Sequence, residues 1–120
     1  MPKILVIEDI KKWQDMIAGH LAEEFGQNLI LKQAWTIKEA KTLLQDSGFD
    51  IIALDGCMAK TNKLNTLLLL RRIKKHHSCP IIAISSHKKY RQILLENGCT
   101  YACKKWHLSH LMKKILKGSN

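Results

Sequence analysis

The chain has 120 residues, of which 46% are hydrophobic, and a formal net charge of +10. This length is typical of one domain with one core and leaves no room for a conventional DNA-binding domain beside it. We therefore interpret residues 1–120 as a single domain with a core spanning residues 3–117. The apolar run at residues 4–7 is too short for a signal peptide or a membrane span, so we expect a cytoplasmic protein without membrane insertion.

The charge is unevenly distributed along the chain. Residues 1–60 carry nine acidic and seven basic side chains, whereas residues 61–120 carry thirteen basic side chains and one acidic residue, Glu96. A surface formed by so many basic residues attracts anionic partners such as nucleic acid, acidic proteins or anionic lipid. A solvated, solubilising surface is the alternative interpretation.

In the first half of the chain, short apolar runs alternate with amphipathic stretches. Residues 4–7 are continuous and partly β-branched, as in a strand buried on both faces. Residues 13–25 have apolar side chains at helical spacing, and residues 28–33 indicate a second, weaker strand. Thr36 and Glu39 have the spacing of a capping box, which predicts a helix that ends near residues 47–48.

The second half continues the same alternation. Residues 51–54 predict a third strand, and residues 64–73 predict a helix with basic residues in its last turns, where cations are favourable. A fourth strand is predicted at residues 81–84 and a helix at residues 90–96. A short strand at residues 101–103 and a helix at residues 107–117 follow. Five strand–helix units in this order predict an α/β fold with a parallel sheet covered on both faces.

Polar side chains follow four of the five predicted strands. Glu8 and Asp9 follow the first strand, Asp55 the third, Ser85 the fourth and Lys104 the fifth. In a doubly wound sheet the carboxyl ends of the strands form one rim, where ligands bind. Each of these residues alone is more often a cap or turn residue, but together they predict a site.

The chemistry of this set points to phosphoryl transfer. Three carboxylates at close range repel one another and need a cation, and carboxylate oxygens suit Mg²⁺. A carboxylate can also attack phosphorus and form an acyl phosphate. Lys104 would supply a second cation, and the Ser85 hydroxyl would hydrogen-bond a phosphoryl oxygen.

With these residues, the sequence resembles the receiver domain of bacterial two-component systems over about residues 3–117. The resemblance lies in the segments ILVIEDI, FDIIALDGCM, PIIAISS and NGCTYACKKW. It implies a (βα)5 doubly wound, five-stranded parallel sheet that is flavodoxin-like, with strand order 2-1-3-4-5.

The resemblance also implies roles for individual residues. Asp55 would be the phosphoacceptor and Lys104 would pair with the phosphoryl group. Asp9 and Asp55 would bind Mg²⁺ directly, and Glu8 would bind it mainly through water. The backbone carbonyl of Cys57 would be the last of the ligands that the protein supplies to the ion.

Signalling roles follow from the same resemblance. Ser85 would sense the phosphoryl group, and Tyr101, three residues before Lys104, matches the aromatic switch residue. The face formed by the fourth helix, fifth strand and fifth helix would then be read by a protein partner. A histidine kinase or phosphotransfer protein would supply the phosphoryl group, and we expect no enzymatic activity beyond self-catalysed phosphotransfer and autodephosphorylation.

The sequence departs from the family at several positions. Ala59 stands where the family has proline, residues 62–63 replace a usual Asp-Gly, and residues 85–98 form a shorter segment. Lys105 stands where the family has a proline directly after its lysine. Without this proline, the cis peptide bond that normally orients the lysine is lost. Lys104 is the better match for that lysine, and Lys105 competes with it.

Other functions remain open from the sequence. One is a pseudo-receiver that binds nucleic acid or an acidic protein without phosphorylation, through Lys88, Lys89, Arg91, Lys105, Lys113, Lys114 and Lys117. A homodimer is also compatible with the sequence. An aspartyl phosphatase is disfavoured, because Cys57 stands where those enzymes have an acidic residue. The four cysteines are expected to be reduced thiols, and a structural zinc site is the less favoured alternative.

Overall fold

A computed structural model describes residues 1–118 of the chain. Its centre is a five-stranded parallel sheet in the order β2-β1-β3-β4-β5, which confirms the predicted fold and strand order. The strands are β1 (Lys3–Ile7), β2 (Ile30–Ala34), β3 (Ile51–Leu54), β4 (Ile81–Ala83) and β5 (Tyr101–Ala102). The last two residues of the predicted domain, 119–120, lie outside the described residues.

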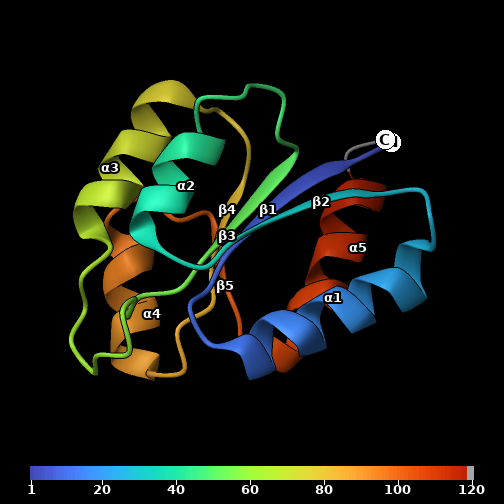
Figure 1. Cartoon of the computed structure of the whole chain (residues 1–120). Helices are drawn as coiled ribbons and strands as arrows, with labels where there is room; N and C mark the ends of the chain where they lie inside the picture. Colours follow the sequence, from blue (N-terminus) through green and yellow to red (C-terminus); the bar gives the residue numbers. More distant parts are fainter. Residues whose placement is uncertain (119–120) are drawn as a thin grey trace.

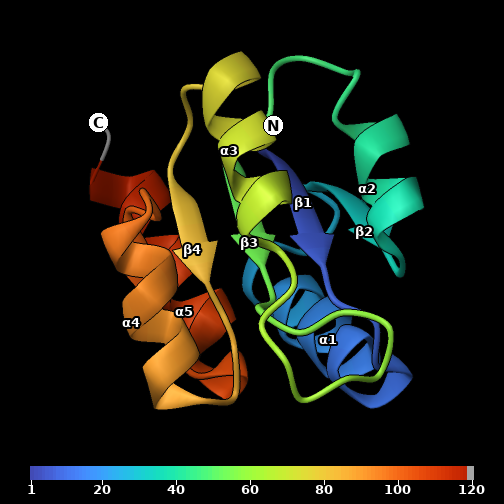
Figure 2. The same cartoon turned by 90° about the vertical axis from the view of Figure 1, so that its left-hand side faces the viewer.

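Helices cover both faces of the sheet, as Figures 1 and 2 show. One face carries α1 and α5, and the other carries α2, α3 and α4. Their bounds are α1 (Lys11–Phe25), α2 (Ile37–Leu43), α3 (Leu67–His76), α4 (Lys88–Glu96) and α5 (Leu108–Gly118), with a short 3-10 helix, η1 (Lys105–His107), before α5.

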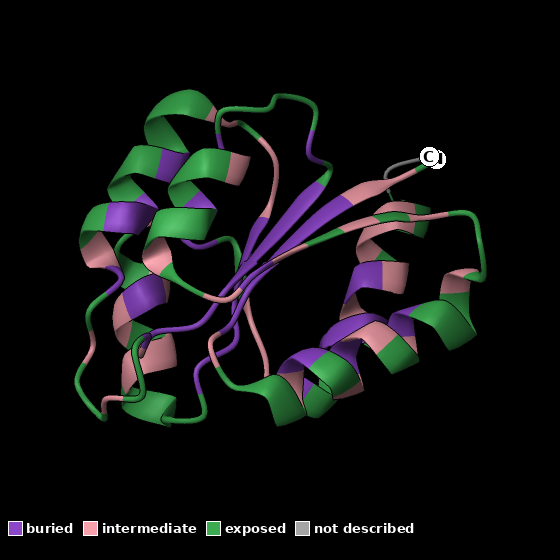
Figure 3. Ribbon diagram, viewed as in Figure 1, coloured by how far each residue is buried: buried purple, intermediate pink, exposed green. Residues whose placement is uncertain are grey.

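Alternation along the central strands divides the core into two clusters. In β1, Ile4 and Val6 pack with Leu21 of α1 and Met112 of α5. Leu5 belongs to the opposite cluster, beneath α2, α3 and α4. Because successive side chains of a strand point to opposite faces, a strand buried on both sides must be apolar throughout. Figure 3 shows the central strands buried along most of their length.

Local hydrogen bonding explains where α2 begins and ends. The backbone N–H of Glu39 donates to Thr36 Oγ1 over 3.0 Å, which confirms the predicted cap. The helix ends at Leu43 rather than near residues 47–48. There the Gln45 N–H donates to the Thr42 carbonyl, and the Asp46 N–H donates to the Leu43 carbonyl. Hydrogen bonds between residues three apart are of the 3-10 type, and they tighten the last turn of a helix and end it.

The third helix begins later than predicted, at Leu67 instead of residue 64. Asn65 bonds both the N–H and the carbonyl of Met58 through its side-chain amide, each over 2.8 Å. The Thr66 hydroxyl donates to the backbone carbonyl of Asp55, also over 2.8 Å. Short polar side chains that bond to loop backbone in this way compete with helix formation, so the helix starts only after them.

Among residues 1–118, no helix is long and apolar enough to cross a membrane. The four cysteines are free thiols. Within the same residues, cysteine and histidine side chains form no group of three or more that could hold a metal ion.

Candidate functional site

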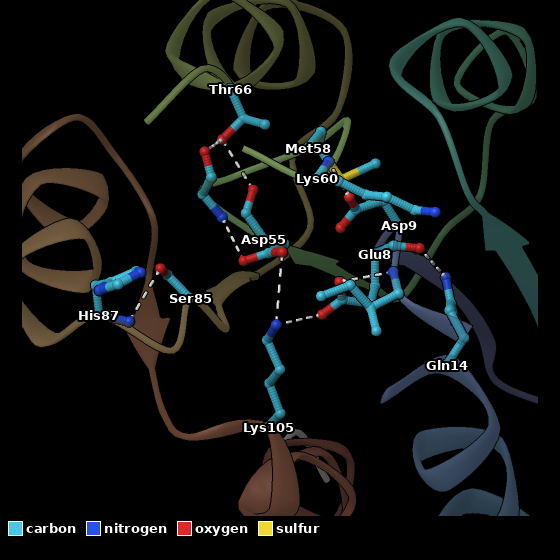
Figure 4. A network of polar contacts seen from close by, with 12 residues as sticks. Glu8, Asp9, Gln14, Asp55, Met58, Lys60, Thr66, Ser85, His87 and Lys105 are labelled. Atoms are coloured by element: carbon cyan, nitrogen blue, oxygen red, sulfur yellow. Dashed lines mark hydrogen bonds and ion pairs between the residues drawn. The ribbon is translucent and has the colours of Figure 1, made fainter. Parts of the chain in front are cut away.

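The carboxyl ends of β1 and β3 bring three acidic side chains together. Ligand oxygens of Glu8, Asp9 and Asp55 all lie within 4.8 Å of one another. Glu8 is fully buried and Asp55 is 3% exposed. Figure 4 shows these side chains converging from the two neighbouring strands. The structure thus places these three predicted residues in one cluster.

The lysine of this cluster is Lys105, so the prediction of Lys104 is wrong. Lys105 is 4% exposed, and its Nζ lies 2.6 Å from Glu8 Oε1 and 3.5 Å from Asp55 Oδ2 (Figure 4). Lys104 is exposed, and its Nζ lies 5.4 Å from the ring centroid of Trp106. The chain turns into η1 directly after Lys104, and this turn carries the next side chain inward.

Burial makes the cluster electrostatically costly. It raises the pKa of Glu8 to about 8, with repulsion from Asp55 adding to the effect and the ion pair with Lys105 opposing it. Burial also raises the pKa of Asp55, against the attraction of Lys105. One ammonium group therefore does not offset the burial of these carboxylates, and the site favours additional positive charge.

The donor set fits a hard divalent cation. Asp9 Oδ2 accepts the backbone N–H of Lys60 over 2.6 Å, while Asp9 Oδ1 is buried and has no hydrogen-bond partner within the described part of the chain. A buried carboxylate oxygen needs a partner, and Mg²⁺ binds such oxygens in proteins. Cys57, whose carbonyl was predicted as a further ligand, is half-buried and lines the same cavity.

The loop after β3 has an unusual backbone. Ala59 has φ +64° and Lys60 has φ +54°, in a region that residues other than glycine seldom occupy. Proline has φ fixed near about −65°, so the loop conformation excludes proline at Ala59, where the family has it. Strain of this kind persists where surrounding contacts hold it, and here the Lys60 N–H is held by Asp9.

Ser85 lies across the cavity from the acidic cluster. This cavity, of about 300 Å³, is lined by Asp9, Asp55, Ser85, Lys105 and the loop residues between β3 and α3, among others. Ser85 is 1% exposed, and its Oγ accepts the backbone N–H of His87 over 3.3 Å (Figure 4). The hydroxyl hydrogen remains available to a ligand in the cavity.

Two residues that support the site were not predicted. Gly56 leaves little space for a side chain, because an added Cβ would lie 3.0 Å from Leu64 Cδ1 and 3.3 Å from Ser85 Oγ, and these groups would have to shift slightly to admit it. Thr66, fully buried, ties the backbone of Asp55 to the start of α3 (Figure 4). A small residue after a strand and a threonine before a leucine run are the signals that the sequence offers for them.

Tyr101 does not occupy the predicted switch position relative to the site lysine. Counted from Lys105, the residue three positions earlier is Ala102. Ala102 packs against the cluster beneath α3 and α4, and Cys103 packs against the opposite cluster. By alternation Tyr101 lies on the same side as Cys103, and it is 39% exposed. An inward-turning aromatic residue is therefore absent from the position that the family spacing predicts.

Three of the seven basic residues predicted for an anionic partner are engaged elsewhere. Lys105 is buried in the site. The Lys113 Nζ lies 2.8 Å from Glu24 Oε2, and the Arg91 guanidinium donates to the Ser85 carbonyl over 2.9 Å. Lys88, Lys89, Lys114 and Lys117 remain exposed.

Comparison with known proteins agrees with the fold. A family model described as response regulator receiver domain matches residues 4–116. A two-component response regulator from Clostridium difficile has a similar structure (TM-score 0.82, 21% identity, covering 100% of this chain and 99% of that one). The receiver domain of NtrX from Brucella abortus is also similar (TM-score 0.77, 25% identity, covering 95% of this chain and 98% of that one). Among curated proteins, no sequence matches significantly.

Proposed function

Because the chain belongs to the family of response regulator receiver domains, we propose that Asp55 accepts a phosphoryl group from a histidine kinase or phosphotransfer protein. The observation that carries this proposal is the surroundings of the Asp55 carboxylate. It lies close to two other acidic side chains and to a buried lysine, and it lines a cavity at the carboxyl end of β3.

In the proposed step, an Asp55 carboxylate oxygen attacks the phosphorus atom of a phosphohistidine. An O–P bond forms and the N–P bond breaks. The electron pair of the broken bond stays on the imidazole nitrogen, which then takes up a proton from solvent. The Gly56 N–H donates to Asp55 Oδ1 over 2.8 Å and helps to orient the carboxylate.

Glu8, Asp9 and Asp55 would hold Mg²⁺ beside the Cys57 carbonyl. The ion would neutralise charge on the phosphoryl oxygens, which otherwise repel the nucleophile. Lys105, rather than Lys104, would pair with a phosphoryl oxygen from the other side. Ser85 would donate its hydroxyl hydrogen to another phosphoryl oxygen and so register that the group is present.

The proposed output is a change in the face formed by α4, β5 and α5, read by a protein partner in the cytoplasm. Ser85 connects the site to this face, because its backbone carbonyl accepts a hydrogen bond from Arg91 of α4. The only reactions that we propose for the chain are self-catalysed phosphotransfer and autodephosphorylation.

The test is phosphorylation by acetyl phosphate with and without Mg²⁺, measured as intact mass. We expect a Mg²⁺-dependent gain of one phosphoryl group that Asp55→Asn abolishes. Asp46→Asn, which changes an exposed aspartate remote from the cavity, is the matched control and should behave as the wild type. A folded wild-type protein that gains no mass would reject the proposal.

The alternative, a phosphorylation-independent module that binds nucleic acid through the basic half, has less support. Its predicted contacts include the buried Lys105 and the paired Lys113. It would predict binding of nucleic acid that weakens steeply with salt and is unchanged in Asp55→Asn.

A further inference from the structure

The lysine of the site lies against one member of an aromatic pair. Trp13 of α1 is half-buried, and its ring centroid lies 6.3 Å from that of Trp106 in η1. The Lys105 Nζ lies over the Trp13 ring, 5.3 Å from its centroid. We propose that Trp13 is a positioning residue, which holds the Lys105 ammonium at the phosphorylation site through a cation–π contact.

The contacts of Lys105 show why such a residue matters. Its ammonium has two acidic partners, Glu8 Oε1 at 2.6 Å and Asp55 Oδ2 at 3.5 Å. Both are carboxylates that would also bind a divalent cation, and Asp55 would itself carry the phosphoryl group. The charge on both partners is therefore shared or altered during the proposed reaction, whereas the Trp13 ring stays the same throughout.

The strength of the contact follows from burial. A cation over a tryptophan face is attracted by the ring quadrupole, and the attraction is larger when the cation is shielded from water. Lys105 is 4% exposed. Lys12 also lies over the Trp13 ring, at 5.2 Å, but its side chain is exposed and water weakens its attraction. Lys105 is thus the cation that gains most from this ring.

Lys105 sits in a short turn, in which the His107 N–H donates to the Lys104 carbonyl over 3.0 Å and the Leu108 N–H donates to the Lys105 carbonyl. Lys104 is extended, with φ −73° and ψ 152°, and Lys105 opens a 3-10 helix of only three residues. Trp106, the next residue, packs against Trp13 and ties this short helix to α1. Trp13 therefore contacts the segment that carries Lys105 at two points, through the Trp106 ring and through the ammonium at the end of the Lys105 side chain.

The first measurement concerns position and does not depend on phosphorylation. In proton NMR spectra, the ε-methylene protons of Lys105 should be displaced upfield by the ring current of Trp13. Trp13→Leu should remove this displacement. Trp35→Leu, which removes a half-buried tryptophan directly after β2, is the matched control and should keep it. An unchanged Lys105 signal in Trp13→Leu would overturn the proposal.

The second measurement is the rate of phosphorylation by acetyl phosphate in saturating Mg²⁺. We expect Trp13→Leu to be slower by about tenfold, the order expected for loss of one shielded cation–π contact. Trp13→Phe should recover most of the rate, because it keeps an aromatic face, and Trp35→Leu should be unaffected. Equal rates in Trp13→Leu and the wild type would overturn the positioning role.

A double-mutant cycle separates positioning from a general effect on folding. Trp13→Leu should slow the reaction much less in a Lys105→Ala background, because no ammonium remains to be positioned. Full additivity of the two effects would contradict the proposal. If the wild type shows the ring-current displacement but takes up no phosphoryl group, the proposed function fails and the kinetic role of Trp13 with it, while the contact stands.

Discussion

The raised pKa of Glu8 leads to a pH dependence of stability that can be worked out from the structure. Burial and repulsion from Asp55 raise it from 4.5 to about 8 in the folded state, despite Lys105. Below pH 4.5, Glu8 is protonated in both states and contributes no difference. Between pH 4.5 and 8, only the unfolded chain loses the proton, so the free energy of unfolding falls as the pH rises.

The size of this effect follows from the shift. Each unit of pKa difference corresponds to about 1.4 kcal/mol, so the rise from 4.5 to about 8 corresponds to a loss of up to about 5 kcal/mol across the window. Glu8→Gln removes the charge and keeps the shape. Without divalent cations, we expect this variant to match the wild type near pH 4.5 and to exceed its stability by about 2–5 kcal/mol near pH 8.5.

Urea denaturation at several pH values, with EDTA present, measures this difference directly. Glu23→Gln, which neutralises an exposed acid of α1, is the matched control and should follow the wild type at every pH. Asp55→Asn should reduce the slope for the wild-type Glu8, because repulsion from Asp55 contributes to the shift. A Glu8→Gln variant no more stable than the wild type near pH 8.5 would refute the reasoning.

Three further predictions concern single positions. Lys105→Ala should slow phosphorylation by acetyl phosphate by at least about tenfold, while Lys104→Ala should remain near the wild-type rate; the reverse order would restore Lys104 to the site. Thr66→Val should lower the free energy of unfolding by about 1–3 kcal/mol in urea denaturation, because a buried hydroxyl that donates to the loop backbone is lost; an unchanged midpoint would show that the loop holds without it. Gly98→Ala should lower the thermal midpoint of unfolding, because Gly98 has φ +116° and a Cβ there would lie 2.3 Å from a lysine side chain of α3. Gly19→Ala, in open space on α1, should raise the thermal midpoint by adding helix propensity. Equal shifts in the two variants would contradict this prediction.

The fold was predictable because its signals are local and repeated. A strand buried on both faces, such as β1, must be apolar at every position, and the run Ile4–Leu5–Val6–Ile7 satisfies this without reference to any neighbour. The cap at Thr36 depends only on residues within one turn. The acidic cluster was predictable for a related reason, since parallel strands place their carboxyl ends on one rim.

The choice between Lys104 and Lys105 was not predictable in the same way. A strand fixes the direction of a side chain by alternation, but β5 has only two residues, and the chain enters η1 immediately afterwards. Which lysine points inward then depends on how η1 packs against α1. The contact between Trp13 and Trp106, which joins residues far apart in the sequence, belongs to that packing.

The sequence by itself therefore determined the succession of strands and helices along the chain and the acidic residues at the rim, because these follow from periodicity and chain direction. Only the tertiary structure decided the start of α3, the inward lysine and the failure of Tyr101 to match the switch position. Each of these depends on contacts between segments distant in sequence, such as the hydrogen bond from Thr66 to the Asp55 carbonyl. Such contacts leave no periodic pattern in the chain, since their energy comes from the folded arrangement alone.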